Sequence, residues 1–236
     1  MKSQITKAKD RGAVDAGWLK ARHYFSFGTY FNPNRMGFGK LRVINDDRMD
    51  KGTGFGTHSH QNMEIITIPL QSAVLHKDSM KNEGLVKSGE VQVMSAGTGV
   101  SHSEHNASKE EALKLFQIWI EPNKRNVEPR YDQAKYDMSE NNKWVQLVSP
   151  IDSDEAGLKI YQNAFISRGV FEANKVVNYK RKSSENGILV LLISGSILID
   201  KKALEVRDSM ALTGIENLEI KAEETSDILI IEVPID

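Results

Sequence analysis

The chain has 236 residues, of which 39% are hydrophobic and 27% are charged, and its formal net charge is −1. This length suits one large or two small globular domains, and the balanced charge gives no electrostatic reason to expect binding to nucleic acid or to a membrane surface. Cysteine is absent, so disulfides and thiolate ligands are excluded, and any metal ion must be bound by nitrogen and oxygen atoms.

Neither a secretory signal nor a membrane span is visible in the sequence. The N-terminus, MKSQITKAKDRGAV, contains no apolar segment of the kind that signal peptides carry. The longest apolar run, ILVLLISGSILI at residues 188–199, is too short to cross a bilayer and is interrupted by Ser194, Gly195 and Ser196. We therefore expect a cytoplasmic protein.

Short runs rich in Val, Ile and Leu, separated by Gly, Asn, Asp and Ser, predict β-strands in the first half of the chain. They cover residues 40–45, 64–70, 73–78, 90–96 and 113–120. In the last of these runs both alternating faces are mostly apolar, so we expect this strand to be covered on both sides. The polar segment 121–142 breaks the pattern. It is predicted to connect two β-rich halves and to include a short helix at YDQAKYDM (131–138).

The second half of the chain repeats the pattern of the first. EIITIPLQSAVLHKD (64–78) and ILVLLISGSILIDKK (188–202) each contain an apolar strand, a turn of small residues and a second apolar strand. This repeat predicts two related β-barrels or sandwiches. All six histidines lie within the first 105 residues, and VVNYKRKSS (176–184) stands roughly where the first half has HSH. A histidine-based metal site therefore belongs to the first half.

Two short polar patterns have the spacing of metal ligands. His58 and His60 are two residues apart, as are His102 and Glu104, and side chains with this spacing on a strand point to the same face. Neighbouring strands would bring together three imidazoles and a carboxylate, a set that suits Fe(II), Mn(II), Ni(II), Cu(II), Zn(II) or Co(II). Four protein ligands leave two positions of an octahedral ion open for a substrate or O2.

Glycines come before both ligand pairs and belong to a longer motif. The first motif has the form G-x5-H-x-H-x3-E-x6-G and is matched by Gly52, His58, His60 and Glu64, with Gln71 in place of the last glycine. The second is matched by Gly89 and SAGTGVSHSEHN (95–106), which contains His102 and Asn106. Glycine at 54, 56, 97 and 99 would also allow the tight turns and close backbone approach that a barrel mouth requires.

With these motifs, and with the segments GWLKARHYFSFGTY (17–30), GFGKLRVINDD (37–47) and LHKDSMKN (75–82), the chain resembles the pirin family of the cupin superfamily. The resemblance is dense from about residue 11 to 122 and is greatest to bacterial pirin-like proteins described as quercetin 2,3-dioxygenases. It implies an all-β bicupin with two antiparallel β-barrel (jelly-roll) domains and a few short helices. We place the metal-binding domain at 1–125 and a domain without a metal site at 126–236.

The resemblance also implies which residues bind the metal. The ligands carried over are His58, His60, His102 and Glu104, and Fe(II) is the favoured ion. Glu64 matches a glutamate that binds metal in many other cupins, but in pirin-like proteins the carboxylate ligand corresponds to Glu104. Glu64 is therefore expected to orient a ligand imidazole instead.

The other histidines and the aromatic residues receive separate predictions. His76 is interpreted as a hydrogen-bonded barrel residue, with a supporting role beside the metal as the alternative; His23 is interpreted as structural, and His105, on the opposite face of its strand, as no ligand. Phe55 is predicted to line the mouth of the site. The remaining aromatic residues of interest are assigned to the core: Trp18, Phe25, Phe27, Phe116 and Trp119.

The function that the resemblance implies is a metal-dependent dioxygenase that opens the ring of a flavonol such as quercetin with O2. Glu104 would act either as a plain ligand or as the base that takes the substrate proton. One alternative is a non-enzymatic, iron-binding regulatory protein of the pirin type that docks on a protein partner. Another is a dioxygenase for a different enol-bearing aromatic compound, since a fold does not fix a function. We expect the protein to be a monomer.

Overall fold

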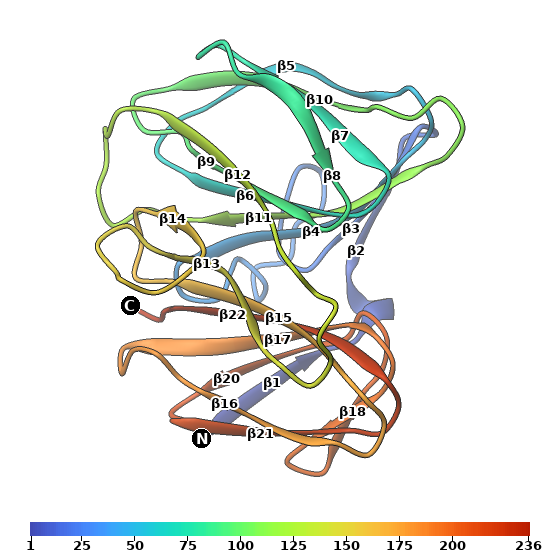
Figure 1. Ribbon diagram of the computed structural model, residues 1–236, viewed down its shortest axis with the longest axis vertical. Helices are drawn as coiled ribbons and strands as arrows, with labels where there is room; N and C mark the ends of the chain where they lie inside the picture. Colours follow the sequence, from blue (N-terminus) through green and yellow to red (C-terminus); the bar gives the residue numbers. More distant parts are fainter.

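The computed structural model describes residues 1–236 and shows two β-barrels stacked along the long axis of the molecule (Figure 1). Each barrel consists of a seven-stranded sheet that faces a four-stranded sheet. The predicted all-β bicupin fold is therefore confirmed.

The first barrel contains most of the N-terminal half. The strands of its seven-stranded sheet are, in chain order, β2 (Gly12–Asp15), β3 (Leu19–His23), β4 (Leu41–Met49), β6 (Glu64–Gln71), β9 (Glu90–Ser95), β11 (Leu113–Ile120) and β12 (Arg130–Lys135). The strands of its four-stranded sheet are β5 (Gly54–His60), β7 (Ala73–Asp78), β8 (Glu83–Lys87) and β10 (Val100–Asn106). The five strands that the sequence predicts correspond to β4, β6, β7, β9 and β11.

The second barrel contains most of the C-terminal half. The strands of its seven-stranded sheet are β1 (Lys2–Thr6), β13 (Val145–Pro150), β14 (Leu158–Ile160), β15 (Phe165–Phe171), β17 (Asn186–Ser194), β20 (Ser209–Thr213) and β22 (Ser226–Pro234). The strands of its four-stranded sheet are β16 (Val176–Lys180), β18 (Ile197–Ile199), β19 (Lys202–Leu204) and β21 (Asn217–Ala222).

The strand orders of the two barrels match position by position. The order β12-β9-β6-β11-β4-β3-β2 corresponds to β1-β20-β17-β22-β15-β13-β14, and β5-β10-β7-β8 corresponds to β16-β21-β18-β19. The repeat that relates residues 64–78 to 188–202 is confirmed, because β6 and β17 occupy equivalent places and lead into the equivalent strands β7 and β18. The second-half segment beginning at Val176 forms β16, the equivalent of the histidine-bearing β5.

The barrels exchange one strand each at their outer edge. The N-terminal strand β1 pairs with β20 of the second barrel, whereas β12 pairs with β9 of the first. The predicted boundary between residues 125 and 126 therefore separates most, but not all, of the strands of the two barrels.

Helical structure is almost absent. The helix predicted at 131–138 is wrong, because residues 131–135 belong to β12 and pair with β9. The few helices expected reduce to one 3-10 turn, η1 (Ala8–Asp10). No helix is long and apolar enough to cross a membrane.

The largest hydrophobic core lies between the two seven-stranded sheets, which face each other in the middle of the molecule (Figure 1). It contains Phe116 and Ile118 of β11 together with Leu229 and Ile231 of β22. Because the other face of β11 packs inside the first barrel, this strand is buried on both sides, as predicted. The shared core fixes the floor of the first barrel, and the candidate site is built above this floor.

Candidate metal centre

Three histidines converge inside the first barrel. β5 pairs with β10 so that His58 lies opposite His102, and His60 follows on the same face of β5. The ring of His58 is 4.4 Å from that of His102 and 4.9 Å from that of His60, measured between centroids. One nitrogen of each ring lies within 4.8 Å of the others, which is the arrangement that a shared metal ion requires.

The protonation of these rings favours metal binding. Burial, followed by the charges of neighbouring histidines, lowers the pKa of His60 to about 4 and that of His102 to about 3, so both imidazoles are neutral near pH 7 and have a free lone pair. Neither nitrogen of the buried His102 has a hydrogen-bond partner in the protein. Nδ1 of His58 is 2.8 Å from the carbonyl oxygen of Gly56, which leaves Nε2 of His58 for the centre. A metal ion would satisfy one nitrogen of His102 together with Nε2 of His58.

Glu104 lies beside the histidines but belongs to a second, overlapping set. Its carboxylate is buried and accepts hydrogen bonds from Nε2 of Gln117 at 2.8 Å and Oγ1 of Thr67 at 3.3 Å. Burial raises its pKa. One of its carboxylate oxygens lies within 4.8 Å of ring nitrogens of His102 and His76, and these three residues form one set. His58, His60 and His102 form the other set. The four predicted ligands are therefore brought together through His102, which both sets share.

A local irregularity lies beside the site. The register between β10 and β5 shifts between His102 and Glu104, because the step from His58 to Phe55 on β5 is one residue longer than the step from His102 to Glu104 that it faces, so β5 carries the extra residue of a β-bulge. Gly54 makes the close approach of the strands possible, because a Cβ atom at this position would lie 2.3 Å from the carbonyl oxygen of Glu104. The predicted need for glycine near the first pair thus holds at Gly54.

His76 is only half satisfied by hydrogen bonding. Its Nε2 is 3.1 Å from the carboxylate of Asp78, and its ring stacks on that of Tyr131, but its buried Nδ1 has no partner. The interpretation of His76 as a hydrogen-bonded barrel residue therefore holds for Nε2 but not for Nδ1. One of its ring nitrogens lies within 4.8 Å of donor atoms of His102 and Glu104.

Glu64 points away from the centre. Its carboxylate accepts a 2.7 Å hydrogen bond from Oγ of Ser95, and the backbone of Tyr161 from the second half of the chain also contacts it. The prediction that Glu64 orients a ligand imidazole is wrong, because the turn before β6, where Asn62 has a φ of 50°, reverses which face the even-numbered residues occupy. In β6 it is the odd-numbered Thr67 that reaches Glu104.

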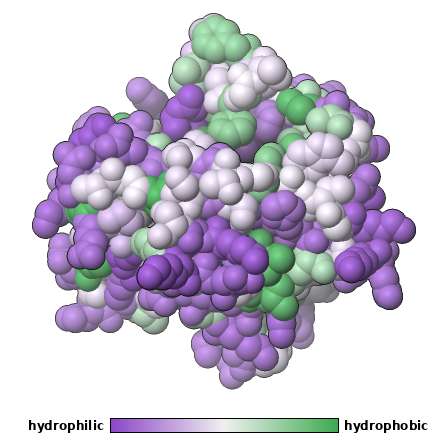
Figure 2. Space-filling view, turned by 90° about the horizontal axis from the view of Figure 1, so that it is seen from above, coloured by the Kyte–Doolittle hydropathy of each residue, from purple (hydrophilic) through white to green (hydrophobic).

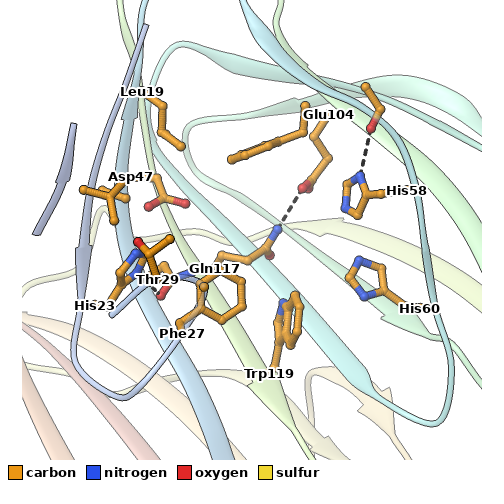
Figure 3. A pocket seen from close by; sticks show the side chains of 16 residues that line it. Leu19, His23, Phe27, Thr29, Asp47, His58, His60, Glu104, Gln117 and Trp119 are labelled. Atoms are coloured by element: carbon orange, nitrogen blue, oxygen red, sulfur yellow. Dashed lines mark hydrogen bonds between the residues drawn. The ribbon is translucent and has the colours of Figure 1, made fainter. Parts of the chain in front are cut away.

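A cavity of about 440 Å³ opens beside the histidines (Figure 3). It is lined by His58, His60 and Glu104, by the aromatic rings of Phe27, Phe55 and Trp119, by the apolar side chains of Val14, Leu19 and Ala21, by the polar residues His23, Asn45, Asp47, Gln117 and Thr29, and by Gly28 and Gly56. The prediction that Phe55 lines the mouth is confirmed.

Two aromatic residues and one histidine were assigned too simply by the sequence. Phe27 and Trp119 meet edge to face at 5.2 Å between centroids and line the cavity. The assignment of Phe27 to the core is wrong, whereas Trp119 both packs against a core cluster and lines the cavity. Phe116 is fully buried in the core, as predicted. His23 has the structural contact expected of it, with Nδ1 2.7 Å from Oδ1 of Asn45, but it also lines the cavity.

Asp47, Asn45 and Gln117 escaped the sequence analysis although all three line the cavity. The signal was present in β4, where every odd-numbered residue from Leu41 to Met49 is buried. Polar residues at 45 and 47 in that inward phase indicate groups that face the barrel interior. Burial and the nearby acidic groups Asp46 and Glu104 raise the pKa of Asp47 to about 8.

Sequence profiles of known families match both halves of the chain. Residues 5–120 match the pirin profile, and residues 146–233 match a profile described as a quercetinase C-terminal cupin domain. A protein of Escherichia coli K12 named quercetin 2,3-dioxygenase is 38% identical over 230 residues, which is 98% of each chain. The chain belongs to the pirin family. A pirin-like protein of Caulobacter vibrioides is 35% identical over 222 residues, or 94% of this chain and 95% of the relative.

Solved structures of pirins show the same architecture. The bacterial pirin YhhW of Escherichia coli in complex with nickel(II) superimposes with a TM-score of 0.93 at 36% identity, and 99% of each chain is covered. A quercetin 2,3-dioxygenase of Acinetobacter baumannii superimposes with a TM-score of 0.82 at 18% identity over 98% of this chain and 86% of that one, a likeness of fold alone. Together with the histidine cluster, the pirin structure with nickel supports a divalent metal ion in this family member.

Proposed function

We propose that this pirin is a metal-dependent dioxygenase that opens the ring of a flavonol such as quercetin with O2. The observation that carries the proposal is the buried His58, His60 and His102 cluster, which adjoins a cavity of about 440 Å³ with aromatic walls. Such a cavity has the size and apolar lining of a small-molecule site. The names of the relatives support the flavonol as substrate.

The residues present fit a divalent ion. His58, His60 and His102 would hold it with Glu104 as the carboxylate ligand, and Fe(II) is the ion we favour for this nitrogen and oxygen set. A bound ion would supply Lewis acidity toward a flavonol hydroxyl and so favour loss of the hydroxyl proton.

We assign Glu104 as the group that accepts the proton of the flavonol hydroxyl. Its carboxylate is held by Gln117 and Thr67, and the pKa that burial raises makes it a better proton acceptor than an exposed glutamate. One oxygen of this carboxylate could take the hydroxyl proton of a bound flavonol. With the flavonol deprotonated, O2 adds to the ring, which opens with loss of CO.

The cavity walls would position the flavonol and exclude water. Trp119 lies edge-on to His60, at 4.9 Å between centroids, and Phe27 lies against Trp119, so a planar ligand beside the histidines would contact aromatic rings. Phe55 contacts the ring of His58 on the other side of the cluster. Excluding water strengthens the electrostatic stabilisation of the enolate.

To test this, the protein is loaded with iron, copper, manganese or nickel in separate samples. Each sample is then incubated with quercetin, both in air and without air. We expect bleaching of quercetin and release of CO only with O2 present, and neither with a His102→Ala variant. Protein that binds metal but leaves quercetin unchanged with all four ions would exclude the dioxygenase and favour the regulatory alternative.

A further inference from the structure

Asp47 is a buried acidic residue that the protein itself leaves without a partner. It is 5% exposed, its side chain makes no hydrogen bond or ion pair, and its Oδ1 is fully buried and unpaired. Its cross-strand neighbours are Leu115 on β11 and Ala21 on β3, neither of which can form a hydrogen bond through its side chain. Buried polar groups are almost always hydrogen-bonded, so this carboxyl group needs an explanation.

The neighbouring acidic residues show that the protein can pair such groups. Asp46, next in the chain, is paired with Arg11 at 2.8 Å and Arg207 at 3.1 Å. Glu104 accepts hydrogen bonds from Gln117 and Thr67. Among these acidic residues the missing partner is therefore specific to Asp47.

The position of Asp47 points to a ligand as the missing partner. Its side chain lines the same cavity as the histidines, and Figure 3 shows it on the opposite side of that cavity from His58 and His60. The rings of Phe27 and Trp119 lie between these two sides (Figure 3). A planar molecule with one oxygen at the histidines would extend along these rings toward Asp47.

We propose that Asp47 is the second polar anchor of the cavity and hydrogen-bonds a hydroxyl group of the substrate that is remote from the oxygen at the histidines. The inference rests on the proposed function, because it defines the substrate class of the same cavity: planar aromatic compounds with hydroxyl groups at both ends. The apolar wall around Asp47, formed by Val14, Leu19 and Ala21, suits a neutral aromatic ligand better than a strongly hydrated ion. Asp47 thereby determines specificity, because a buried group built to pair with a hydroxyl disfavours ligands that lack it.

The experiment measures equilibrium binding of flavonols to the nickel-loaded protein without O2. The reference ligand is quercetin. Kaempferol lacks one hydroxyl of quercetin's pendant ring, galangin lacks both, and fisetin lacks one hydroxyl of the fused ring. We expect loss of one particular hydroxyl to weaken binding to the natural protein about tenfold, and to change binding to Asp47→Leu less than about twofold. Asp47→Asn, which keeps the shape and can still hydrogen-bond, should retain part of the preference.

The matched control is Asp15→Asn, which makes the same substitution at an exposed side chain on β2. It should leave the ranking of the flavonols unchanged, and all variants should bind nickel in the same stoichiometry.

If the hydroxyl preference of Asp47→Leu equals that of the natural protein for every ligand, the anchor role is wrong even if quercetin is turned over. If quercetin binds and the preference depends on Asp47 but no O2-dependent turnover occurs, the anchor role holds and the dioxygenase proposal fails. If no flavonol binds, both fall.

Discussion

In the first barrel, β5 and β10 carry imidazoles into the interior, whereas the equivalent strands of the second barrel, β16 and β21, carry Tyr179, Leu218 and Ile220. The second interior is filled by one core of 15 buried residues, and the first contains two apolar groups of 7 and 4 residues beside a cavity of about 440 Å³. The same topology thus supports either close packing or a hollow polar site, depending on which side chains point inward.

Stability and function are divided between the two barrels. Close packing of apolar side chains is the main source of stability, and the second barrel and the shared core between the sheets provide it. The first barrel keeps unpaired buried atoms in His76, His102 and Asp47, which are destabilising until a ligand satisfies them. Arg207 links the two, since it reaches from the second barrel to Asp46 and lies over the ring of Phe116.

The largest expected effect comes from removing the histidine that both ligand sets share. His102→Ala should lower metal affinity by at least about 100-fold, because ligand losses exceed the 10–100-fold effects of residues that only support ligands. Elemental analysis and competition with a chelator measure this. His105→Ala, on the same strand but outside both sets, should keep the metal. Full metal content in His102→Ala would show that the ion binds elsewhere.

A second contrast compares one leucine of the filled barrel with one leucine of the hollow barrel. Leu192 is completely buried in the second interior, whereas Leu19 borders the cavity. Leu192→Ala should lower the free energy of unfolding by about 3 kcal/mol and Leu19→Ala by about 1 kcal/mol, because a side chain beside existing space leaves less new cavity surface. Denaturant titration measures both. Equal losses would mean that the first interior is packed as closely as the second.

Two buried glutamates on the facing sheets give a contrast that depends on pH. Glu232 of β22 accepts hydrogen bonds from the Tyr179 hydroxyl, the Asn186 amide and the backbone of Lys182 and Ser183. Glu64 has fewer donors, and burial raises its pKa from 4.5 to about 7. Between these pH values the folded state holds a proton that the unfolded state has lost, so the stability that the protonated form provides declines as pH rises.

Glu64→Gln should therefore leave stability nearly unchanged at pH 4 and raise the free energy of unfolding at pH 8 by about 2 kcal/mol. The shift from 4.5 to about 7 would give roughly 3 kcal/mol if it were expressed in full. The control Glu232→Gln should lower stability at both pH values, because it weakens a satisfied network. A stability difference for Glu64→Gln that does not change with pH would show that the pKa of Glu64 is the same in the folded and the unfolded state.

The sequence predicts the strands and the histidine pairs well because both depend on local periodicity. The apolar runs of β6 and β11 and the spacing of His58 and His60 follow directly from the two-residue repeat of a strand. The orientation of Glu64 could not be obtained in this way, since a turn at Asn62 resets the phase between β5 and β6. The exchange of β1 and β12 depends on pairing between distant segments, which no local pattern records.

Asp47 was missed for a related reason. Two adjacent aspartates in INDD look like solvent-exposed residues, and only the burial of the alternate positions of β4 separates their roles. Phe27 likewise lies in a loop, where its approach to Trp119 depends on the folded arrangement of β11 and the segment after β3.

The adjacent aspartates supply the smallest and most specific contrast. Asp46→Asn should lower the free energy of unfolding by about 1 kcal/mol, because Arg11 and Arg207 lose their charged partner. Asp47→Asn should raise it by about 1 kcal/mol near pH 8, because it removes a buried acid without breaking any bond within the protein. Thermal or denaturant unfolding of the metal-loaded protein without substrate measures both. Opposite signs for neighbouring residues of one strand would identify Asp47 as a residue kept for its ligand, whereas a loss of stability in both variants would mean that Asp47 has a partner within the fold.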